Sequence, residues 1–483
     1  MDCLYNHISQ MKRPSDWAGS IIPIGDLEKS WTCAHVRIVV PDMGDDGVKF
    51  VQKYLLRTIS LLVYVRSSDA RSTILELTQS QTHFDESLHA VELDDNFILR
   101  DKRDYFLDTR IFFTAPVLTE GEDITLESGQ KMPLVRTEGG RLGYGQNGDV
   151  LGYMIPPGHL KRNNEDSNTE EVLVAVKTLS KNLPAAKLES KILAQLRNLL
   201  LDKPIQICTC LTMITDEKNI HSLSFRATGN LREKYEILKS HDEEPVDGDW
   251  FKSCMRQIRG LAEALEFLHH QESKGKGSCF CHMDIKPENI LVFERDSSDI
   301  GIVGTWKLID FGITTMSVKK FSLTDGGARN KGSEQRITIT VGTTPRTIAS
   351  RYQPPEINLN RTEWEMGKAR KMGRGSDVWS LACVFAEVLA ANLGQLNTLE
   401  DRIKGNEYFY RKDKNVPVCL KRFRDKGYTR HGYFDEWLKV LEKRGKSEPS
   451  LKVCHELIHQ MTYIQRIRRM KSEQVVKYMN KLF

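Results

Sequence analysis

Apolar side chains recur every three or four residues along residues 47–64, and this spacing predicts an amphipathic helix. Its apolar face is made of Val48, Val51, Leu55, Ile59 and Leu62. Shorter helices are expected over residues 72–77 and 85–91. Because no catalytic grouping of side chains occurs in this stretch, we expect residues 1–130 to form a mainly helical region that serves as a scaffold or binds a partner.

Near residue 132 the pattern changes to short strands separated by glycine-rich turns. Strands are expected over residues 132–137, 149–155 and 171–178, with a polar surface loop over 156–169. Helical patterns dominate from Trp250 onward. A strand-rich half followed by a helix-rich half predicts an α+β unit of two lobes over residues 131–483. The small lobe is expected at about 131–226 and the large lobe at about 227–483.

Composition narrows the class of protein. The chain has 483 residues, enough for two or three domains, and its net charge of +5 is small for this length, so a nucleic-acid partner is not expected. We expect no secretory signal, because the N-terminus shows no basic region followed by an apolar core, and no membrane span, because the longest apolar run is far short of the ~20 residues that a span requires. The ten cysteines form no disulfide framework. Free thiols in a reducing interior are therefore expected, in the cytoplasm or the nucleus.

A glycine-rich stretch over residues 141–150 has the pattern G-x-G-x-x-G-x-V. Its members are Gly143, Gly145, Gly148 and Val150. Glycine allows main-chain N–H groups to approach phosphate oxygens closely. A dinucleotide-binding motif would require these glycines to open a helix. Strand-like sequence follows instead, so a hairpin over phosphates is favoured.

A lysine ends the next predicted strand. Lys177 follows a buried apolar run, where an ammonium group is costly without a partner. Glu189 flanks the apolar stripe of the helix expected over residues 187–196. It either points to solvent or pairs with Lys177, and the upstream lysine favours the pair. Such a pair would hold Lys177 against the α- and β-phosphates of a nucleotide.

Residues 281–292 carry the most informative chemistry. They place a carboxylate, an ammonium and an amide within six residues, at Asp284, Lys286 and Asn289. A second carboxylate, Asp310, ends a later strand. Phosphoryl transfer from a nucleotide needs these groups: one carboxylate accepts the proton of the attacking hydroxyl, a cation meets the phosphoryl group, and an amide and another carboxylate hold Mg²⁺.

The order and spacing of these groups resemble the catalytic loop and metal-binding turn of eukaryotic protein kinases. The resemblance covers residues 135–483, and the spacing of the apolar blocks is most similar to multi-domain kinases of filamentous fungi. It implies a bilobal kinase fold and transfer of the γ-phosphoryl group of ATP, with Mg²⁺, to a protein. The lysine two residues after Asp284 is similar to that of serine/threonine kinases.

By this resemblance Asp284 is the catalytic base, Lys286 neutralises charge on the γ-phosphoryl group, and Asn289 and Asp310 ligate Mg²⁺. The resemblance also assigns adenine contacts. Leu223 is expected to be the gatekeeper residue, next to a hinge that contains Phe225. The remaining nucleotide contacts are expected from Leu142, Val150 and Ala175.

The chain departs from the kinase pattern at several positions. Met283 stands where many kinases have an arginine that binds a phosphorylated activation segment, so we expect activity to be independent of that contact. The segment between residues 310 and 356 is long and basic, which leaves open a preference for acidic substrates or a flexible insertion without a recognition role. Gly342-Thr343 lies farther from the Pro-Pro-Glu turn than is usual, and Ala349 replaces an expected threonine.

Two structural contacts are also implied by the resemblance. Glu356 is expected to pair with Arg469, and Asp377 is expected to brace the backbone of the catalytic loop. Three functions remain for comparison: an active protein kinase, a pseudokinase that binds nucleotide or partners as a scaffold, and a small-molecule phosphotransferase. The chain keeps the strand lysine, the loop aspartate and the metal-site aspartate, which favours the active protein kinase.

Overall fold

The computed structural model divides into two compact units. One contains Met1–Ser190 and Cys210–Arg226, and the other contains Lys191–Thr209 and Ala227–Phe483. The structure describes residues 2–15, 19–89, 100–127, 130–145, 148–162, 168–200, 203–240, 248–270, 272–273, 276–294, 303–311, 315–319, 336–339, 350–356, 373–403, 408–412 and 427–483.

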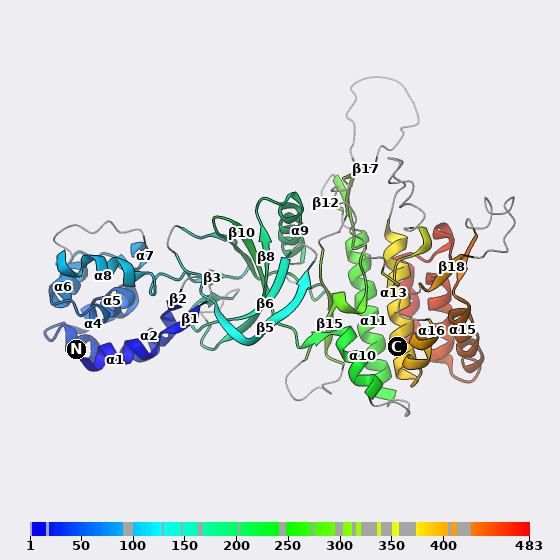
Figure 1. Ribbon diagram of the computed structural model, residues 1–483, viewed down its shortest axis with the longest axis horizontal. Coiled ribbons are helices and arrows are strands. Elements are labelled where there is room, and N and C mark those ends of the chain that lie inside the picture. Colours follow the sequence, from blue (N-terminus) through cyan, green and yellow to red (C-terminus); the bar gives the residue numbers. More distant parts are fainter. Residues whose placement is uncertain are drawn as a thin grey trace, which may run out of the picture. The chain divides into compact units, whose positions relative to one another are not determined.

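The N-terminal part of the first unit is mainly helical, as predicted (Figure 1). Its elements are α1 (Asp2–Gln10), β1 (Arg13–Ser15), β2 (Gly19–Ile21), α2 (Ile24–Ser30), α3 (Cys33–Val39), α4 (Asp45–Tyr54), α5 (Leu56–Tyr64), α6 (Ala70–Gln79), α7 (Phe84–Ser87) and α8 (Arg100–Arg110). These helices enclose a continuous apolar core to which α5 contributes most of its length.

The single helix predicted over residues 47–64 is wrong, because the chain breaks at Leu55 into α4 and α5. The carboxylate of Asp85 supplies the reason. It accepts hydrogen bonds from the backbone N–H groups of Arg57 (2.7 Å) and Thr58 (2.8 Å) and from the Thr58 hydroxyl (2.6 Å). Asp85 thus satisfies N–H groups that a new helix start leaves without partners.

The rest of the first unit is a six-stranded sheet and the first part, up to Ser190, of helix α9 (Pro184–Leu200) (Figure 1). The strand order is β4 (Ile124–Thr125), β9 (Thr212–Thr215), β10 (Asn219–Phe225), β8 (Val172–Ser180), β6 (Gly148–Ile155) and β5 (Val135–Gly145). The loop expected over 156–169 also carries a short strand, β7 (Leu160–Lys161), which pairs in parallel with β3 (Leu118–Thr119). An apolar core covers one face of the sheet.

The N-terminal helices contact the sheet through the turn that follows β6. The N–H of Gly25 donates to the carbonyl of Pro157 (3.1 Å), and a Cβ added to Gly25 would lie 2.5 Å from that carbonyl carbon. The N–H of Ile24 donates to Nε2 of His159 (3.1 Å), and Nδ1 of His159 lies 2.9 Å from the carbonyl oxygen of Pro116. His159 is therefore a neutral imidazole with one donor and one acceptor nitrogen in use.

The second unit is mostly helical (Figure 1). Together with the sheet of the first unit, its helices confirm the predicted α+β class. Its helices are α10 (Leu231–Ser240), α11 (Gly248–His269), α13 (Arg374–Asn392), α14 (Leu396–Arg402), α15 (Gly432–Arg444), α16 (Pro449–Met461) and α17 (Ser472–Met479), with short 3-10 turns η1 (Pro287–Asn289), η3 (Arg466–Arg468) and η4 (Asn480–Leu482). Helix α13 is buried from Ser376 to Asn392. Among the described helices, none is both long and apolar enough to cross a membrane.

The second unit also contains small sheets. One has the order β11 (Gly229–Asn230), β14 (Ile290–Phe293) and β15 (Thr305–Leu308). Another has the order β12 (Glu272–Ser273), β13 (Lys276–Cys281), β16 (Thr315–Lys319) and β17 (Arg336–Ile339). The third pairs β18 (Tyr410–Lys412) with β19 (Tyr428–Arg430). Strand β13 ends directly before the segment that carries Asp284.

Candidate active site

In the first unit, the predicted nucleotide contacts gather around Lys177. Val150 on β6 lies directly opposite Lys177 on β8, and residues opposite each other in an antiparallel pair share a face of the sheet. Ala175, two residues earlier on β8, therefore lies on the same face. A Cβ added to Gly152, which is opposite Ala175, would lie 3.5 Å from Leu142. Leu142 thus belongs to this group.

The glycine-rich stretch is a hairpin of β5 and β6, as the sequence favoured, with Gly145 opposite Gly148. A Cβ on Gly148 would lie 2.0 Å from the carbonyl oxygen of Thr178 on β8, so glycine is needed there for strand packing. A Cβ on Gly143 would meet no atom within 4 Å. The two glycines therefore differ in physical role. The predicted loop tip, Asn147, lies outside the described residues.

Lys177 and Glu189 form the ion pair that the sequence favoured. The side chain of Glu189 is 2% exposed and that of Lys177 is 16% exposed. Glu189 lies in the second turn of α9, and α9 follows β8 after a turn of three residues. Burial makes the loss of either partner costly, because the other charge would remain without compensation.

The gatekeeper assignment of Leu223 is wrong. Leu223 lies opposite Val176 on β8, so its side chain is on the face away from Lys177. It is fully buried in the apolar core of that face. Ser222, opposite Lys177, and Ser224 lie on the lysine side instead.

The side-chain contact expected of Phe225 is contradicted by the same strand register. Phe225 lies opposite Val174, on the core face, and its ring is 5.1 Å from the guanidinium of Arg162. Only the backbone of Phe225 therefore remains available for the adenine contact predicted from sequence.

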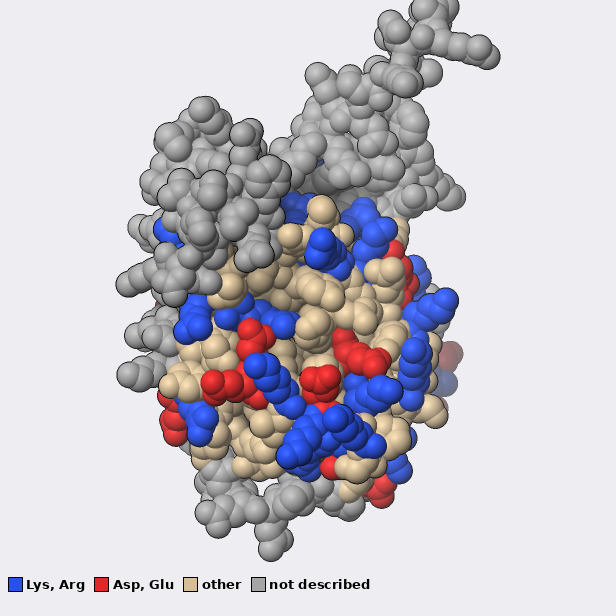
Figure 2. Space-filling model, turned by 90° about the vertical axis from the view of Figure 1, so that its right-hand side faces the viewer, with Lys and Arg blue, Asp and Glu red and all other residues tan. Residues whose placement is uncertain are grey.

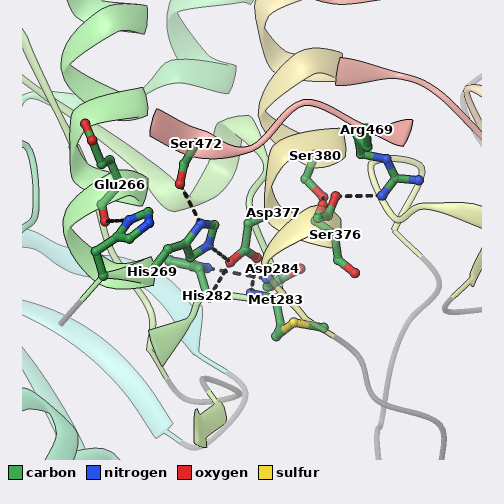
Figure 3. Close-up of polar contacts among 12 residues, drawn as sticks. Glu266, His269, His282, Met283, Asp284, Ser376, Asp377, Ser380, Arg469 and Ser472 are labelled. Atoms are coloured by element: carbon green, nitrogen blue, oxygen red, sulfur yellow. Dashed lines mark hydrogen bonds and ion pairs between the residues drawn. The ribbon is translucent and has the colours of Figure 1, made fainter. Parts of the chain in front are cut away.

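In the second unit, three predicted catalytic groups contact one another (Figure 3 labels Asp284). Asp284 Oδ2 accepts a hydrogen bond from Lys286 Nζ (2.8 Å) and another from Asn289 Nδ2 (2.9 Å). Asn289 Nδ2 also donates to the backbone carbonyl of Asp284 (2.8 Å). Asp284 is buried and Lys286 is half-buried. The loop thus holds a carboxylate at fixed distance from a cation and an amide.

Asp310 follows β15 in the same unit. The N–H of Ile309 donates to the carbonyl of Asn289 (3.0 Å), which ties the residue before Asp310 to the catalytic loop. His282 Nε2 donates to the carbonyl of Ile309 (2.8 Å), and its ring lies 5.0 Å from that of Phe311. Asp310 itself has φ +63°, a left-handed conformation that is uncommon for a residue with a side chain.

The expected donors for a magnesium ion are chemically suitable. The side-chain nitrogen of Asn289 donates hydrogen bonds to two oxygens of Asp284. The side-chain oxygen of Asn289 therefore remains available to ligate a cation. Carboxylate and amide oxygens are the ligands that Mg²⁺ prefers in proteins. Asn289 and Asp310, on adjacent segments of one unit, therefore fit the ion that the resemblance implies.

Asp377 on α13 braces the catalytic loop, as predicted (Figure 3). Its Oδ2 accepts from the N–H of His282 (2.9 Å), and its Oδ1 accepts from the N–H of Met283 (2.7 Å). Met283 has φ +72°, so the loop is held in a strained backbone conformation at that residue. The brace extends to His269, whose ring nitrogens lie 2.9 Å from Asp377 Oδ2 and 3.0 Å from the Ser472 hydroxyl.

Sequence reasoning missed the role of His269. Its ring, the thiol of Cys281 and the carboxylate of Asp377 lie together in the interior, in an arrangement that could hold a metal ion. The oxygens of Asp377 already accept hydrogen bonds from His269 and from two backbone N–H groups. The cluster therefore serves as a hydrogen-bonded support.

Arg469 pairs with Glu356, as predicted, through two contacts of 2.7 Å and 3.1 Å (Figure 3 labels Arg469). The sequence did not reveal a second buried acid on α13. Glu387 is fully buried, its Oε2 accepts from the hydroxyl of Tyr352 (2.8 Å), and Arg351 lies 3.6 Å from its Oε1. Burial raises the pKa of Glu387 to about 7, opposed by Arg351 and Tyr352. The sequence signal for this buried acid was the position of Glu387 within an apolar stretch of helix.

Most of the basic segment between Asp310 and Glu356 lies outside the described residues, including Gly342-Thr343 and Ala349. The predictions made on those positions stay predictions. Within the described parts of this segment, the strands β16 and β17 pair with each other and, through β16, with β13.

Comparison with known proteins identifies the relatives of this chain. A family model for the protein kinase domain matches residues 140–479. Cyclin-dependent kinase 4 of Mus musculus is 29% identical over 147 residues, which are 30% of this chain and 34% of that protein. Serine/threonine-protein kinase crk1 of Schizosaccharomyces pombe is 31% identical over 184 residues, 36% of this chain and 43% of that protein.

A third relative is more distant. 3-phosphoinositide-dependent protein kinase 1 of Homo sapiens is 26% identical over 209 residues, 43% of this chain and 27% of that protein. The chain thus matches less than half the length of each of these three relatives.

Proposed function

We propose that this chain, which belongs to the protein kinase family, transfers the γ-phosphoryl group of ATP to a serine or threonine hydroxyl of a protein. The observation that carries the proposal is the contact of Asp284 with Lys286 and Asn289 on one loop. A carboxylate held in this way can accept a hydroxyl proton while the neighbouring ammonium offsets charge on the phosphoryl group.

In this proposal Asp284 accepts the proton of the attacking hydroxyl, and Lys286 neutralises charge on the γ-phosphoryl oxygens. Asn289 and Asp310 would hold Mg²⁺, which when bound neutralises phosphate charge. The amide oxygen left available on Asn289 supports that assignment.

Lys177 is assigned to the α- and β-phosphates, and the buried carboxylate of Glu189 keeps its ammonium in place. Because the ion pair with Glu189 holds that ammonium, removing Glu189 should weaken nucleotide positioning. Leu142, Val150 and Ala175 share the Lys177 side of the sheet, which supports their assignment to the adenine ring.

Met283 supports a proposal about control. Its thioether cannot pair with a phosphate, and its N–H is fixed by Asp377. We therefore expect activity without a phosphate–arginine contact at this position. Treatment of the active protein with a phosphatase should leave its rate unchanged. Loss of activity that is restored by rephosphorylating the segment after Asp310 would contradict this.

The N-terminal region and the environment of the protein also belong to this proposal. Residues 1–130 are proposed to bind a partner. Lys and Arg are interspersed with Asp and Glu over the described part of the face in Figure 2, which does not favour a nucleic-acid partner. Eight cysteines of the described residues are free thiols, which supports an intracellular location.

The competing function is a scaffold that binds nucleotide without transfer. Incubation of the purified full chain with γ-labelled ATP, Mg²⁺ and a mixture of acidic and basic proteins separates the two. Label in phosphoserine or phosphothreonine that disappears in Asp310→Asn supports the kinase. Nucleotide binding without any transfer supports the scaffold, and label in phosphotyrosine would contradict the assigned specificity.

A further inference from the structure

Strand β15, which ends two residues before Asp310, is held along both of its edges. Strand β14 pairs with one edge. The other edge is covered by the segment that follows α9. The N–H of Leu308 donates to the carbonyl of Gln206 (3.0 Å), and the N–H of Cys208 donates to the carbonyl of Leu308 (2.9 Å). Residues 206–208 therefore add to this edge as a short parallel strand.

A side chain of helix α11 completes the same edge. The N–H of Trp306 donates to Oε1 of Gln257 (3.0 Å), and the same oxygen accepts a hydrogen bond from Nε2 of Gln206 (2.7 Å). Because a peptide N–H can only donate, the Gln257 atom in this contact is its oxygen, and the Gln206 atom that meets it is its nitrogen. The backbone of β15 thus fixes how both amides are oriented. Gln206 and Gln257 form a glutamine clamp on the edge of β15.

Gly260 makes room for the glutamine clamp. It lies three residues after Gln257 and on the same side of α11. A Cβ added to Gly260 would lie 2.5 Å from both Nε2 and Oε1 of Gln206. Glycine in the interior of a helix is less favourable than alanine. At this position it leaves the space that the Gln206 amide occupies.

The clamped strand leads directly into the metal-site aspartate. Asp310 has φ +63°, a conformation that persists in a residue with a side chain only where the surrounding structure fixes it. On the side of β14, the N–H of Ile309 donates to the carbonyl of Asn289 (3.0 Å). On the opposite edge, the glutamine clamp holds Trp306 and Leu308. The backbone before Asp310 is therefore fixed from both sides.

We propose that Gln257 and Gln206 are positioning residues for phosphoryl transfer. By fixing the outer edge of β15 they set the place of the Asp310 carboxylate, and through it the affinity of the site for Mg²⁺. Both glutamines act through the backbone of β15, so neither is a catalytic residue. This inference rests on the proposed function, in which Asp310 ligates Mg²⁺.

The test measures the affinity of the full chain for a non-hydrolysable ATP analogue, once in Mg²⁺ and once in EDTA. Gln257→Leu removes the shared acceptor and keeps a side chain of similar size. It should weaken binding in Mg²⁺ by about tenfold, the lower end of the roughly 10- to 100-fold that loss of a residue supporting a metal ligand costs. Its affinity in EDTA should be unchanged. Gln257→Glu keeps an oxygen that accepts from both donors, so it should bind as the wild type does.

Two glycine variants of α11 repeat the test without changing either glutamine. Gly260→Ala should displace the Gln206 amide and reproduce the effect of Gln257→Leu, although alanine favours the helix. Gly248→Ala is the matched control, because a Cβ there meets nothing within 4 Å, and it should bind as the wild type does. Hydrogen exchange at the Trp306 amide should be faster in Gln257→Leu but not in Gln257→Glu.

Asp310→Asn separates the positioning role from the proposed function. Analogue binding by this variant should lose most of its dependence on Mg²⁺. If it does, while Gln257→Leu and Gly260→Ala bind as the wild type does, the positioning role is overturned and the proposed function stands. Equal weakening of Gln257→Leu in Mg²⁺ and in EDTA would indicate a purely structural role and would also overturn it. The same Mg²⁺ dependence in the wild type and Asp310→Asn would overturn both.

Discussion

Mild acid should release the N-terminal helices from the small lobe through protonation of His159. The imidazole is 1% exposed, and both ring nitrogens are used in their neutral form, by Ile24 and Pro116. Burial, followed by the nearby charge of Arg57, lowers the pKa of His159 from 6.5 to about 3. A proton on Nε2 would abolish the hydrogen bond from Ile24 and bury an uncompensated charge.

The sign and size of the effect follow from these two pKa values. In the unfolded chain the histidine binds a proton below about pH 6.5, whereas in the folded chain it stays neutral down to about pH 3. The stability of the contact is therefore lost as the pH falls through 6.5. The loss should be about 2 kcal/mol at about pH 5. It should approach about 5 kcal/mol near the lower pKa.

Hydrogen exchange at the backbone amides of Ile24 and Gly25 measures this release directly, because both N–H groups are donors at the contact. Their protection should fall between about pH 7 and about pH 5 by roughly 2 kcal/mol after correction for intrinsic rates. His159→Gln keeps one donor and one acceptor but does not titrate, so its pH dependence should be flat. Protection that is independent of pH in the wild type, or equally dependent in both proteins, would refute the reasoning.

Three further changes test other parts of the structure. Gly25→Ala should destabilise the first unit by about 1–3 kcal/mol in denaturant unfolding, because the added Cβ would overlap Pro157. The control Gly44→Ala should cost less than about 1 kcal/mol, because a Cβ there meets nothing within 4 Å. Asp377→Ala should lower the free energy of unfolding by about 3–5 kcal/mol and should lower kcat as well. An unchanged kcat would contradict the bracing role. Burial raises the pKa of Glu387 to about 7, so its contribution to stability should be lost as the pH rises from about 4.5 to about 7, by up to about 3 kcal/mol. That slope in unfolding free energy should disappear in Glu387→Gln.

The sequence was most informative where motif and spacing act together. The Lys177–Glu189 and Glu356–Arg469 pairs each join residues that occupy fixed places in a known pattern, and both contacts are present. Asp377 was found for the same reason. Such residues can be located from sequence because the pattern names both partners, even when they are more than a hundred residues apart.

The errors have physical causes that a single sequence does not reveal. Leu223 was assigned to the nucleotide side, yet a shift of one residue moves every side chain of a strand to the other face, and no motif fixes the register of β10. The break at Leu55 depends on Asp85, whose carboxylate accepts from the N–H groups at the start of α5. No sequence pattern near Leu55 predicts that contact. His159 lies in a segment that reads as a polar loop, so its burial depends on the N-terminal helices that cover it.

The most direct test of the proposed function compares the wild type with Asp284→Asn in steady-state phosphoryl transfer at saturating MgATP. Asparagine keeps an oxygen that can accept from Lys286 and Asn289, so the loop should remain in place while the base is lost. The rate should fall by about 10²- to 10⁴-fold, whereas the dissociation constant for ATP should change by less than about threefold. Equal rates in the two proteins would contradict the assignment of Asp284 as the base and with it the proposed mechanism.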